Sequence, residues 1–244
     1  MTATVRPRLD EPVSILMPVR DECDVIEHVV DEWARDVVAH LPAGSELVVD
    51  ECSEDGTGEI LHRLKAKYPW LVVHRSPRDG FDRAAARLYA AARCPLVFFT
   101  DSDGQYVAAE FWRLVPHLPV SDMVHGAKSD RRDPLYRRAA SKIFNTLVAT
   151  AFGFHGRDVN SAFRLIRHGL VTDIVPQVRR VPVLFNAELY IRAQAKGYRI
   201  TNVDVAHRAR QHGASQGLPS RSFARACWHA LKGLRDLRRE LRAQ

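Results

Sequence analysis

The sequence predicts an α/β fold, with a mainly parallel β-sheet flanked by helices. Short apolar runs alternate with helical patterns along the first 100 residues, as expected when helices cover both faces of a parallel sheet. Hydrophobic residues make up 46% of the 244 residues, which is enough for a large core in one domain. No internal repeat, low-complexity tract or linker divides the chain.

The first part of the chain repeats one unit, an apolar run followed by a helical pattern. The helical spacing is clearest where Val25, Val29 and Trp33 recur on one face. Proline ends the second helix, and alanine dominates the third. The expected elements are a strand at 12–19, a helix at 24–41, a strand at 45–51, a helix at 56–69, a strand at 70–75, a helix at 79–94 and a strand at 95–101.

The pattern is less regular after residue 121. A long helix is expected to begin at Pro134, and Gly197 is expected to end a later one. The expected elements are a strand at 122–128, a helix at 133–153, a strand that passes into a helix at 160–171, a helix at 183–197, a strand at 198–205 and a final helix from Pro219.

Charge and cysteine content limit the function classes. The net charge is +7 and the pI about 9.5, which suits anionic partners such as nucleic acid, an anionic membrane surface or phosphorylated small molecules. The four cysteines lie far apart without a CxxC pair, so neither a zinc cluster nor a disulfide framework is expected. The N-terminus lacks the features of a signal peptide, and no segment reaches the roughly 18 to 20 apolar residues that cross a bilayer. We expect a reduced cytoplasmic protein, soluble or peripheral.

Polar side chains follow the first, second and fourth expected strands, at the point where each strand ends. In open α/β sheets, ligands bind outside the carboxyl ends of the strands. We therefore expect a ligand site at the edge where these side chains gather. They are Arg20, Asp21 and Glu22 after the first strand, Asp50 and Glu51 at the end of the second, and Asp101 and Asp103 after the fourth.

The stretch VFFTDSDGQY, at 97–106, carries the most specific of these patterns. Asp101, Asp103 and Gln105 point to one side of an extended segment and offer only oxygen atoms. Mg²⁺ or Mn²⁺ takes such ligands together with substrate phosphates, and it would stabilise a departing diphosphate. The alternative is an ordinary turn, because Asp, Ser and Gly are common turn residues. The position after the fourth strand favours the metal.

Five segments, in this order and spacing, resemble a family 2 glycosyltransferase of the GT-A fold. More narrowly, they are similar to the polyprenyl-phosphate sugar synthases, the dolichyl-phosphate mannose synthase group. The resemblance covers 12–216 and implies a Rossmann-like GT-A catalytic domain at 1–216, followed by a basic amphipathic helix at 217–244. The segments are SILMPVRDE, ELVVDECSEDGT, VFFTDSDGQY, DVNSAFRLIRH and FNAELYIRAQAKGYRITNVDVAHRARQHGAS.

The resemblance also implies a role for each residue that matches a family motif. Mg²⁺ or Mn²⁺ would be the cofactor, and inversion in a single displacement would be the stereochemical course. The resemblance assigns the nucleotide sugar to Pro18, Arg20, Glu22, Asp50 and Asp101; the metal to Asp101, Asp103 and Gln105; the acceptor phosphate to Lys128, Arg137 and Ser141; and catalysis to Asp103, Asp158 and Arg164.

Some positions depart from the family pattern. Arg20 replaces a tyrosine, and Glu51 and Cys52 replace the second Asp and the Gly of a DDGS motif. These positions lie in the implied nucleotide pocket, so the base and sugar of the donor are left open. Glu188 falls in a later motif, and a pair with Arg192 at i,i+4 of a helix is the rival explanation.

The leading hypothesis is a metal-dependent transfer of a hexose, of mannose or glucose type, from a GDP- or UDP-sugar to a dolichyl or undecaprenyl phosphate. An anionic acceptor needs no strong base, whereas the alternative, a hydroxyl acceptor on a glycolipid, polysaccharide or small molecule, would require Asp158 as base. The remote alternative is a nucleic-acid-binding module. It is disfavoured because the aromatic residues fall at periodic apolar positions, and no nucleic-acid partner is expected.

The final helix is basic and amphipathic. Its arginines lie mostly outside an apolar stripe, which suits a helix that lies on an anionic membrane surface on the cytoplasmic side. The alternatives are a helix that docks on its own domain or on a second protomer, and a separate membrane subunit as partner. The stripe consists of Phe223, Cys227, Leu231, Leu234, Leu237 and Leu241.

Overall fold

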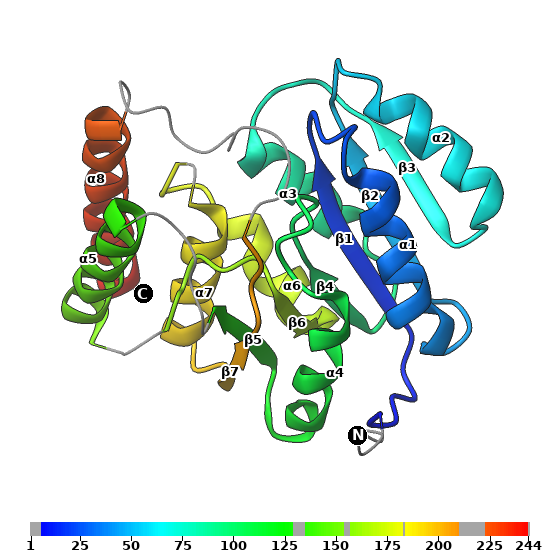
Figure 1. Ribbon diagram of the computed structural model, residues 1–244. Helices are drawn as coiled ribbons and strands as arrows, with labels where there is room; N and C mark the ends of the chain where they lie inside the picture. The colour runs from blue at the N-terminus through cyan, green and yellow to red at the C-terminus, as the bar shows by residue number, and fades with distance from the viewer. Residues whose placement is uncertain (1–5, 129–134, 154–156, 183, 210–222, 244) are drawn as a thin grey trace.

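The computed structural model describes residues 6–128, 135–153, 157–182, 184–209 and 223–243, and within the two helices concerned it leaves out the side chains of 135–141 and 223–227. The molecule is layered, with a central sheet between helices (Figure 1). The chain runs from β1 near the centre of the sheet to the helix α8 at the side opposite β3.

Seven strands form one sheet in the order β3-β2-β1-β4-β6-β5-β7. Strand β6 is antiparallel to both of its neighbours, and the other pairs are parallel. The mainly parallel sheet that the sequence predicts is thus confirmed. The strands are β1 (Val13–Val19), β2 (Glu46–Glu51), β3 (Leu71–Arg75), β4 (Leu96–Phe99), β5 (Met123–Lys128), β6 (Arg164–Arg167) and β7 (Ile200–Val205).

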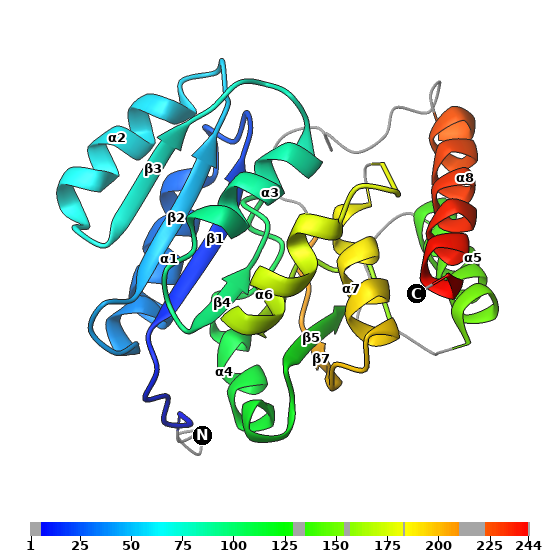
Figure 2. The same ribbon diagram turned by 180° about the vertical axis from the view of Figure 1, so that it is seen from behind.

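Helices cover both faces of the sheet. Helices α1 and α4 lie on one face, and α3 and α6 lie on the other (Figures 1 and 2). Helix α2 packs beside α1, and α7 packs beside α6. The α-helices are α1 (Ile26–Asp36), α2 (Thr57–Lys67), α3 (Phe81–Ala91), α4 (Phe111–Leu114), α5 (Leu135–Phe152), α6 (His168–Ile174), α7 (Phe185–Ala195) and α8 (Phe223–Arg242).

The elements agree closely with those expected, with two exceptions. The segment after the metal loop, from Ala108 to Val120, forms short 3-10 turns around α4, where no helix is expected from the sequence. The strand expected from residue 160 begins only at Arg164. Within the described ranges, none of the helices combines the length and the apolar character that crossing a bilayer requires.

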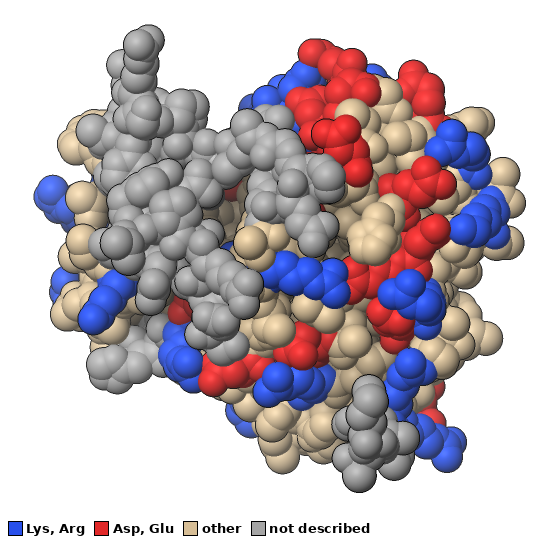
Figure 3. Space-filling model, viewed as in Figure 1, with Lys and Arg blue, Asp and Glu red and all other residues tan. Residues whose placement is uncertain are grey.

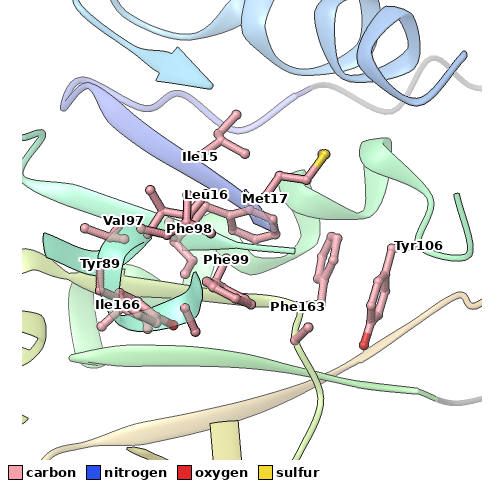
Figure 4. Packing of buried hydrophobic residues seen from close by; sticks show 14 of the residues in the cluster. Ile15, Leu16, Met17, Tyr89, Val97, Phe98, Phe99, Tyr106, Phe163 and Ile166 are labelled. Atoms are coloured by element: carbon pink, nitrogen blue, oxygen red, sulfur yellow. The ribbon is translucent and has the colours of Figure 1, made fainter. Parts of the chain in front are cut away.

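An aromatic cluster supports the end of β4. Phe98 packs edge-on against Phe163 (Figure 4), with ring centroids 4.7 Å apart. The ring centroids of Trp33 and Phe98 are 5.3 Å apart. Phe99 stacks on Tyr89 at 5.2 Å on the other side of the strand. Burial of these large rings on both faces fixes β4 just before Asp101, so the polar loop begins from a rigid base.

Helix α8 packs on the domain through part of the predicted apolar stripe. Leu234 and Leu237 are buried, and Gly233 lies so close to the chain at Arg180 that an added Cβ would collide with the Arg180 carbonyl oxygen. Glu240 accepts from Arg180 and from the buried Arg192. These two leucines therefore contact the protein itself, as in the docking alternative, and are not available to a membrane.

Candidate active site

The carboxyl ends of β1, β2 and β4 lie at one edge of the sheet, because the three strands are parallel neighbours. Pro18 on β1 is directly opposite Asp50 on β2 in the register. Figure 3 shows acidic side chains gathered at the upper edge of the view, near the end of β1, with basic side chains beside them. The polar strand ends that the sequence singles out therefore meet in space.

Two of the carboxylates at the end of β2 already have arginine partners. Asp50 is buried and accepts from Arg87 of α3, with Nε 2.7 Å from Oδ2. Glu51 is also buried and accepts from Arg75 Nη1 at 2.7 Å. Because each carboxylate already has an arginine partner, neither needs a metal ion to balance its charge. A ligand group that displaces the arginine could bond to the carboxylate instead.

The remaining residues expected to contact the nucleotide line the same edge. Pro18 is half-buried, Arg20 is exposed with its Nε 3.6 Å from Asp21, and Glu22 is buried. The backbone N–H of Glu22 donates to the Thr57 hydroxyl at 3.0 Å, which ties the end of β1 to the start of α2.

The loop after β4 brings Asp101 and Asp103 close together. Burial and, next, the negative charge of Asp103 raise the pKa of Asp101 to about 7, against the opposing charges of Lys128 and Arg164. Two carboxylates that repel each other in a partly buried site provide a place where a divalent cation would be favourable. Glu22 adds to the negative potential on Asp101.

The same loop has the geometry of a turn. Asp103 Oδ1 accepts from the Gln105 backbone N–H at 3.1 Å, and Gly104 between them has a φ of +70°, which favours glycine. The Gln105 side chain donates from Nε2 to the Arg208 carbonyl at 3.1 Å, and the Arg208 N–H donates to the Gln105 carbonyl at 2.7 Å. The turn is thus pinned to the segment that follows β7.

Lys128 and Asp158 approach this loop from the C-terminal half of the sheet. Lys128 ends β5, and its Nζ lies 5.2 Å from the centroid of the Tyr106 ring. Its backbone N–H donates to the Asp158 carboxylate at 3.4 Å. Asp158 has a φ of +51°, which is rare for a residue with a side chain and is often found at functional sites.

Arg164 and His125 hold the backbone around Asp158. The buried guanidinium of Arg164 donates to the carbonyls of Ser161 and, at 2.9 Å, of Asn186. His125 Nε2 lies 3.0 Å from the Asp158 carbonyl, and burial lowers the pKa of this histidine to about 3. Both side chains therefore support the turn that carries Asp158 instead of facing the open edge.

Sequence reasoning missed several residues that shape the site. His125 is the one histidine of the strand β5, where its neighbours are mostly apolar. Its position in an apolar strand could have predicted that its side chain is buried. Arg87 and Glu32 gave no local signal, because their partners lie far away in the sequence. Glu32 is buried on α1 and accepts from both Nη atoms of Arg208, at 2.8 and 3.0 Å.

Other expected residues fall outside this cluster or outside the described side chains. Arg137 and Ser141 lie on α5 within the stretch whose side chains are not described. Glu188 pairs with Arg192 at i,i+4, 2.8 Å apart, which confirms the helix-pair explanation, and it also accepts from three consecutive backbone N–H groups, at Arg179, Arg180 and Val181. In the part of the chain that the structure describes, no three His, Cys, Asp or Glu side chains form a metal-binding group.

The family model for glycosyl transferase family 2 matches residues 14–174. This match spans more than half of the chain, from β1 to the end of α6. The chain therefore belongs to glycosyl transferase family 2, and it is a glycosyltransferase. The expected family and enzyme class are confirmed.

Two curated relatives are similar over most of the chain. An uncharacterized glycosyltransferase of Mycobacterium tuberculosis is 28% identical over 211 residues, which cover 84% of this chain and 89% of the relative. An undecaprenyl-phosphate 4-deoxy-4-formamido-L-arabinose transferase of Pseudomonas savastanoi is 28% identical over 224 residues, 89% of this chain and 64% of that protein. The chain thus spans somewhat less than two thirds of the second relative.

Solved structures share the fold at low identity. Glucosyl-3-phosphoglycerate synthase from Mycobacterium tuberculosis, in complex with Mn²⁺, UDP and phosphoglyceric acid, has a TM-score of 0.69 at 18% identity. The match covers 94% of this chain and 79% of the synthase chain. The mannosyltransferase PcManGT from Pyrobaculum calidifontis, in complex with GDP-Man and Mn²⁺, has a TM-score of 0.67 at 17% identity over 94% of this chain and 64% of its own. At these identities the likeness shows the fold alone.

Proposed function

We propose that this family 2 glycosyltransferase moves a hexose, of mannose or glucose type, from a GDP- or UDP-sugar to a polyprenyl phosphate such as dolichyl or undecaprenyl phosphate. The observation that carries the proposal is the pair Asp101 and Asp103 at the sheet edge, with Lys128 facing it from β5. One relative is named for transfer to undecaprenyl phosphate, and two structural neighbours hold Mn²⁺ with a GDP-sugar or with UDP.

The donor would lie across the ends of β1 and β2. Pro18, Arg20 and Glu22 would contact the base and ribose, and Asp50 would accept from the base. For that contact, Asp50 would exchange part of its bond to Arg87, which is also held by Asp79 at 2.8 Å and so keeps a partner. Such an exchange adds no unpaired buried charge.

Mg²⁺ or Mn²⁺ fits the donor set of the loop after β4. Asp101, Asp103 and the Gln105 amide oxygen would hold it, and the two protein carboxylates leave coordination positions for diphosphate oxygens. When bound, the cation would neutralise the negative charge that develops on the departing diphosphate. The Gln105 bond to the Arg208 carbonyl orients the amide oxygen before the cation arrives.

The acceptor would be an anion held by the C-terminal half of the site. Lys128, with Arg137 and Ser141, would fix the acceptor phosphate by charge-assisted hydrogen bonds so that one oxygen lies in line with the anomeric carbon. Asp158 would border this space, and Arg164 would act as a positioning residue through the turn that carries Asp158. A phosphate that is already anionic attacks without a strong base, and the product is inverted.

A hydroxyl acceptor is the second candidate function. It is favoured by the rare backbone conformation of Asp158, whose half-buried carboxylate accepts from the Lys128 backbone N–H and could take a proton. One structural neighbour holds phosphoglyceric acid, a small phosphorylated acceptor. In either case we propose that the enzyme works in the cytoplasm, and for the lipid acceptor at the cytoplasmic face of the membrane or with a membrane subunit.

The test is transfer from a panel of GDP- and UDP-sugars to a short, water-soluble prenyl phosphate, with Mn²⁺ or Mg²⁺ and with a chelator. Metal-dependent formation of a prenyl-linked sugar is the expected result. Asp158→Asn separates the two acceptors, because it should lower transfer to a phosphate only modestly but abolish transfer to a hydroxyl. Donor hydrolysis without any transfer to prenyl phosphate would overturn the lipid acceptor and leave the glycosyltransferase chemistry standing.

A further inference from the structure

Exposed apolar side chains concentrate on two adjacent helices. Among the residues that the structure describes, five large hydrophobic side chains are exposed, and four of them lie on α5 and α8. The two helices pack against each other at the side of the molecule farthest from β3 (Figures 1 and 2). Single exposed apolar residues are ordinary, but a group on neighbouring elements marks an interaction surface. The four are Ile143, Leu147, Trp228 and Leu231, and we call them the α5–α8 face.

The exposed side of α8 carries cations among its apolar residues. Trp228, Arg235 and Arg239 recur at i, i+7 and i+11 and so share one line along the helix, while Leu237 on the opposite side is buried against the domain. Lys232 Nζ lies 5.7 Å from the centroid of the Trp228 ring. The described side chains of α8 that are exposed include no Asp or Glu, so this side of the helix is apolar and positively charged.

On the exposed side of α5, an apolar side chain lies beside threonine hydroxyls that already have hydrogen-bond partners in the helix. Ile143 is 61% exposed. The hydroxyls of Thr146 and Thr150 donate to backbone carbonyls of their own helix, at 2.9 Å to Lys142 and 3.0 Å to Thr146. Threonine hydroxyls bonded in this way need no water partner, as suits an apolar boundary. The sequence of α5 contains no acidic residue.

We infer that the α5–α8 face docks on the surface of an anionic lipid bilayer. Its apolar side chains would enter the headgroup boundary, and Lys232, Arg235, Arg239 and Arg242 would contact anionic headgroups. A second copy of the chain fits this face poorly, because a two-fold interface would bring the same cations together. The inference rests on the proposed lipid-linked acceptor, for which it supplies the contact with the membrane.

The docked face is linked to the site through α5. Asn145 Oδ1 accepts from the Val159 backbone N–H at 3.2 Å, so the helix that carries Ile143 and Leu147 is bonded directly to the turn at Asp158. Contact of α5 with the bilayer would hold the acceptor side of the site near the headgroups, where the phosphate of a polyprenyl chain lies. The buried Leu234 and Leu237 of α8 pack on the domain, and the exposed side of the helix would face the lipid.

The test uses the full chain and vesicles of phosphatidylcholine with or without phosphatidylglycerol. Sedimentation measures the bound fraction. Tryptophan fluorescence reports the environment of Trp228, since Trp33 and Trp112 are buried and the half-buried Trp70 is stacked on Tyr68. We expect binding to the anionic vesicles with a blue shift, and weak binding to the neutral ones. Raising the salt concentration should weaken the binding. Absence of wild-type binding to anionic vesicles would overturn the inference.

Matched variants locate the surface. Trp228→Ser with Leu231→Ser should lower the vesicle partition coefficient by about tenfold or more. Arg235→Gln with Arg239→Gln should lower it by about fivefold per arginine. Val120→Ser is the control, because Val120 is 62% exposed but lies on the turn after α4, away from this face, and it should change binding by less than about twofold. Equal losses in the variants and the control would contradict the assignment.

Two further measurements separate the inference from the proposed function. Transfer to the short, water-soluble prenyl phosphate needs no bilayer, so the Trp228 and Leu231 variant should retain it; binding to vesicles without any such transfer would refute the acceptor and keep the surface. Analytical ultracentrifugation tests the second copy as occupant. The wild type could prove to be a dimer that the Trp228 and Leu231 changes dissociate, while vesicle binding is unaffected. The α5–α8 face would then bind a second protomer and not a membrane, and the inference would be overturned.

Discussion

The two halves of the sheet hold their buried polar groups in different ways. In the N-terminal half, β1 to β4, a carboxylate at a strand end pairs with an arginine side chain, as Asp50 does with Arg87. In the C-terminal half, β5 to β7, the buried Arg164 and His125 around Asp158 bond to backbone instead. The first arrangement joins two side chains, and the second fixes the path of a loop.

The difference indicates how each half can take a ligand. A side-chain pair can exchange one partner for a ligand group while the backbone keeps its course, so the N-terminal half can recognise a donor by replacing contacts. Side chains bonded to backbone carbonyls cannot be exchanged without moving the loop, so the C-terminal half offers a preformed shape. The acidic loop after β4 lies between the two, and it has the groups with the largest expected effect on activity.

The largest expected effect is that of Asp103→Asn. The change keeps the size of the side chain and removes the charge that, with Asp101, would hold the divalent cation. We expect glycosyl transfer to fall by at least about a hundredfold, the scale seen when a group that stabilises developing charge is lost. Steady-state transfer assays across Mn²⁺ concentrations are the measurement.

The control for this change is Asp24→Asn, an exposed acid after the end of β1. It should leave the rate unchanged within about twofold, because Asp24 lies outside the acidic loop and a single exposed charge contributes little. Comparable rates for Asp103→Asn and Asp24→Asn would place the acidic loop outside the chemistry, and the turn would then be its whole role.

Arg87→Gln tests the exchangeable pair of the N-terminal half. Removal of the arginine leaves Asp50 as a buried carboxylate without its cationic partner, so the free energy of unfolding should fall by about 2 kcal/mol. Urea denaturation measures the loss. The matched control is Arg83→Gln one turn earlier on α3, whose contact with Asp79 is 3.8 Å long and whose side chain is 74% exposed; it should cost less than about 0.5 kcal/mol. Equal losses would mean that the Asp50 pair is not a structural feature of this half.

In the C-terminal half, the buried His125 should make the free energy of unfolding depend on pH. His125 has a folded pKa of about 3, below its value in the unfolded chain, so the unfolded state binds the extra proton and stability is lost as the pH falls below about 6.5. Between pH 7 and pH 5 this group should remove about 2 kcal/mol from the free energy of unfolding. Denaturation curves of His125→Gln should lack that part of the slope, whereas those of the exposed His62→Gln should keep it. A His125 variant with the wild-type slope would contradict the assignment.

The two halves also differed in how far the sequence could predict them. The N-terminal strands are continuous apolar runs that stop at polar residues, so their positions in the chain, and the site at their ends, followed from local pattern. The antiparallel direction of β6 could not be predicted in this way, because a run of four residues does not indicate which strands it pairs with. Nor did the burial of Arg164, since an arginine in sequence gives no sign that backbone carbonyls will surround it. Pairs such as Asp50 with Arg87 depend on tertiary packing over 37 positions and leave no short-range signal.

A side-chain contact between α1 and the segment after β7 also joins the two halves, and it gives the smallest of these effects. Glu32 on α1 accepts from both Nη atoms of Arg208 and from the Ala108 N–H at 3.2 Å, and the Arg208 backbone in turn holds Gln105. This chain of bonds ties the end of β7 and the acidic loop to the N-terminal half. Glu32→Gln keeps the shape but replaces a charged acceptor with a neutral amide, so we expect a loss of about 1 kcal/mol of stability.

The functional consequence of Glu32→Gln should be a looser acidic loop. The Mn²⁺ concentration for half-maximal activity should rise about threefold, while the rate at saturating Mn²⁺ stays near that of the wild type, because the ligands themselves are intact. Glu27→Gln on the same helix is the control, since Glu27 is 53% exposed and pairs with Arg63 at the surface. If both variants behave alike, the Glu32–Arg208 contact does not couple the halves, and the loop after β4 needs no support from α1. If only Glu32→Gln shifts the metal requirement, the exchangeable half and the preformed half are coupled through this carboxylate.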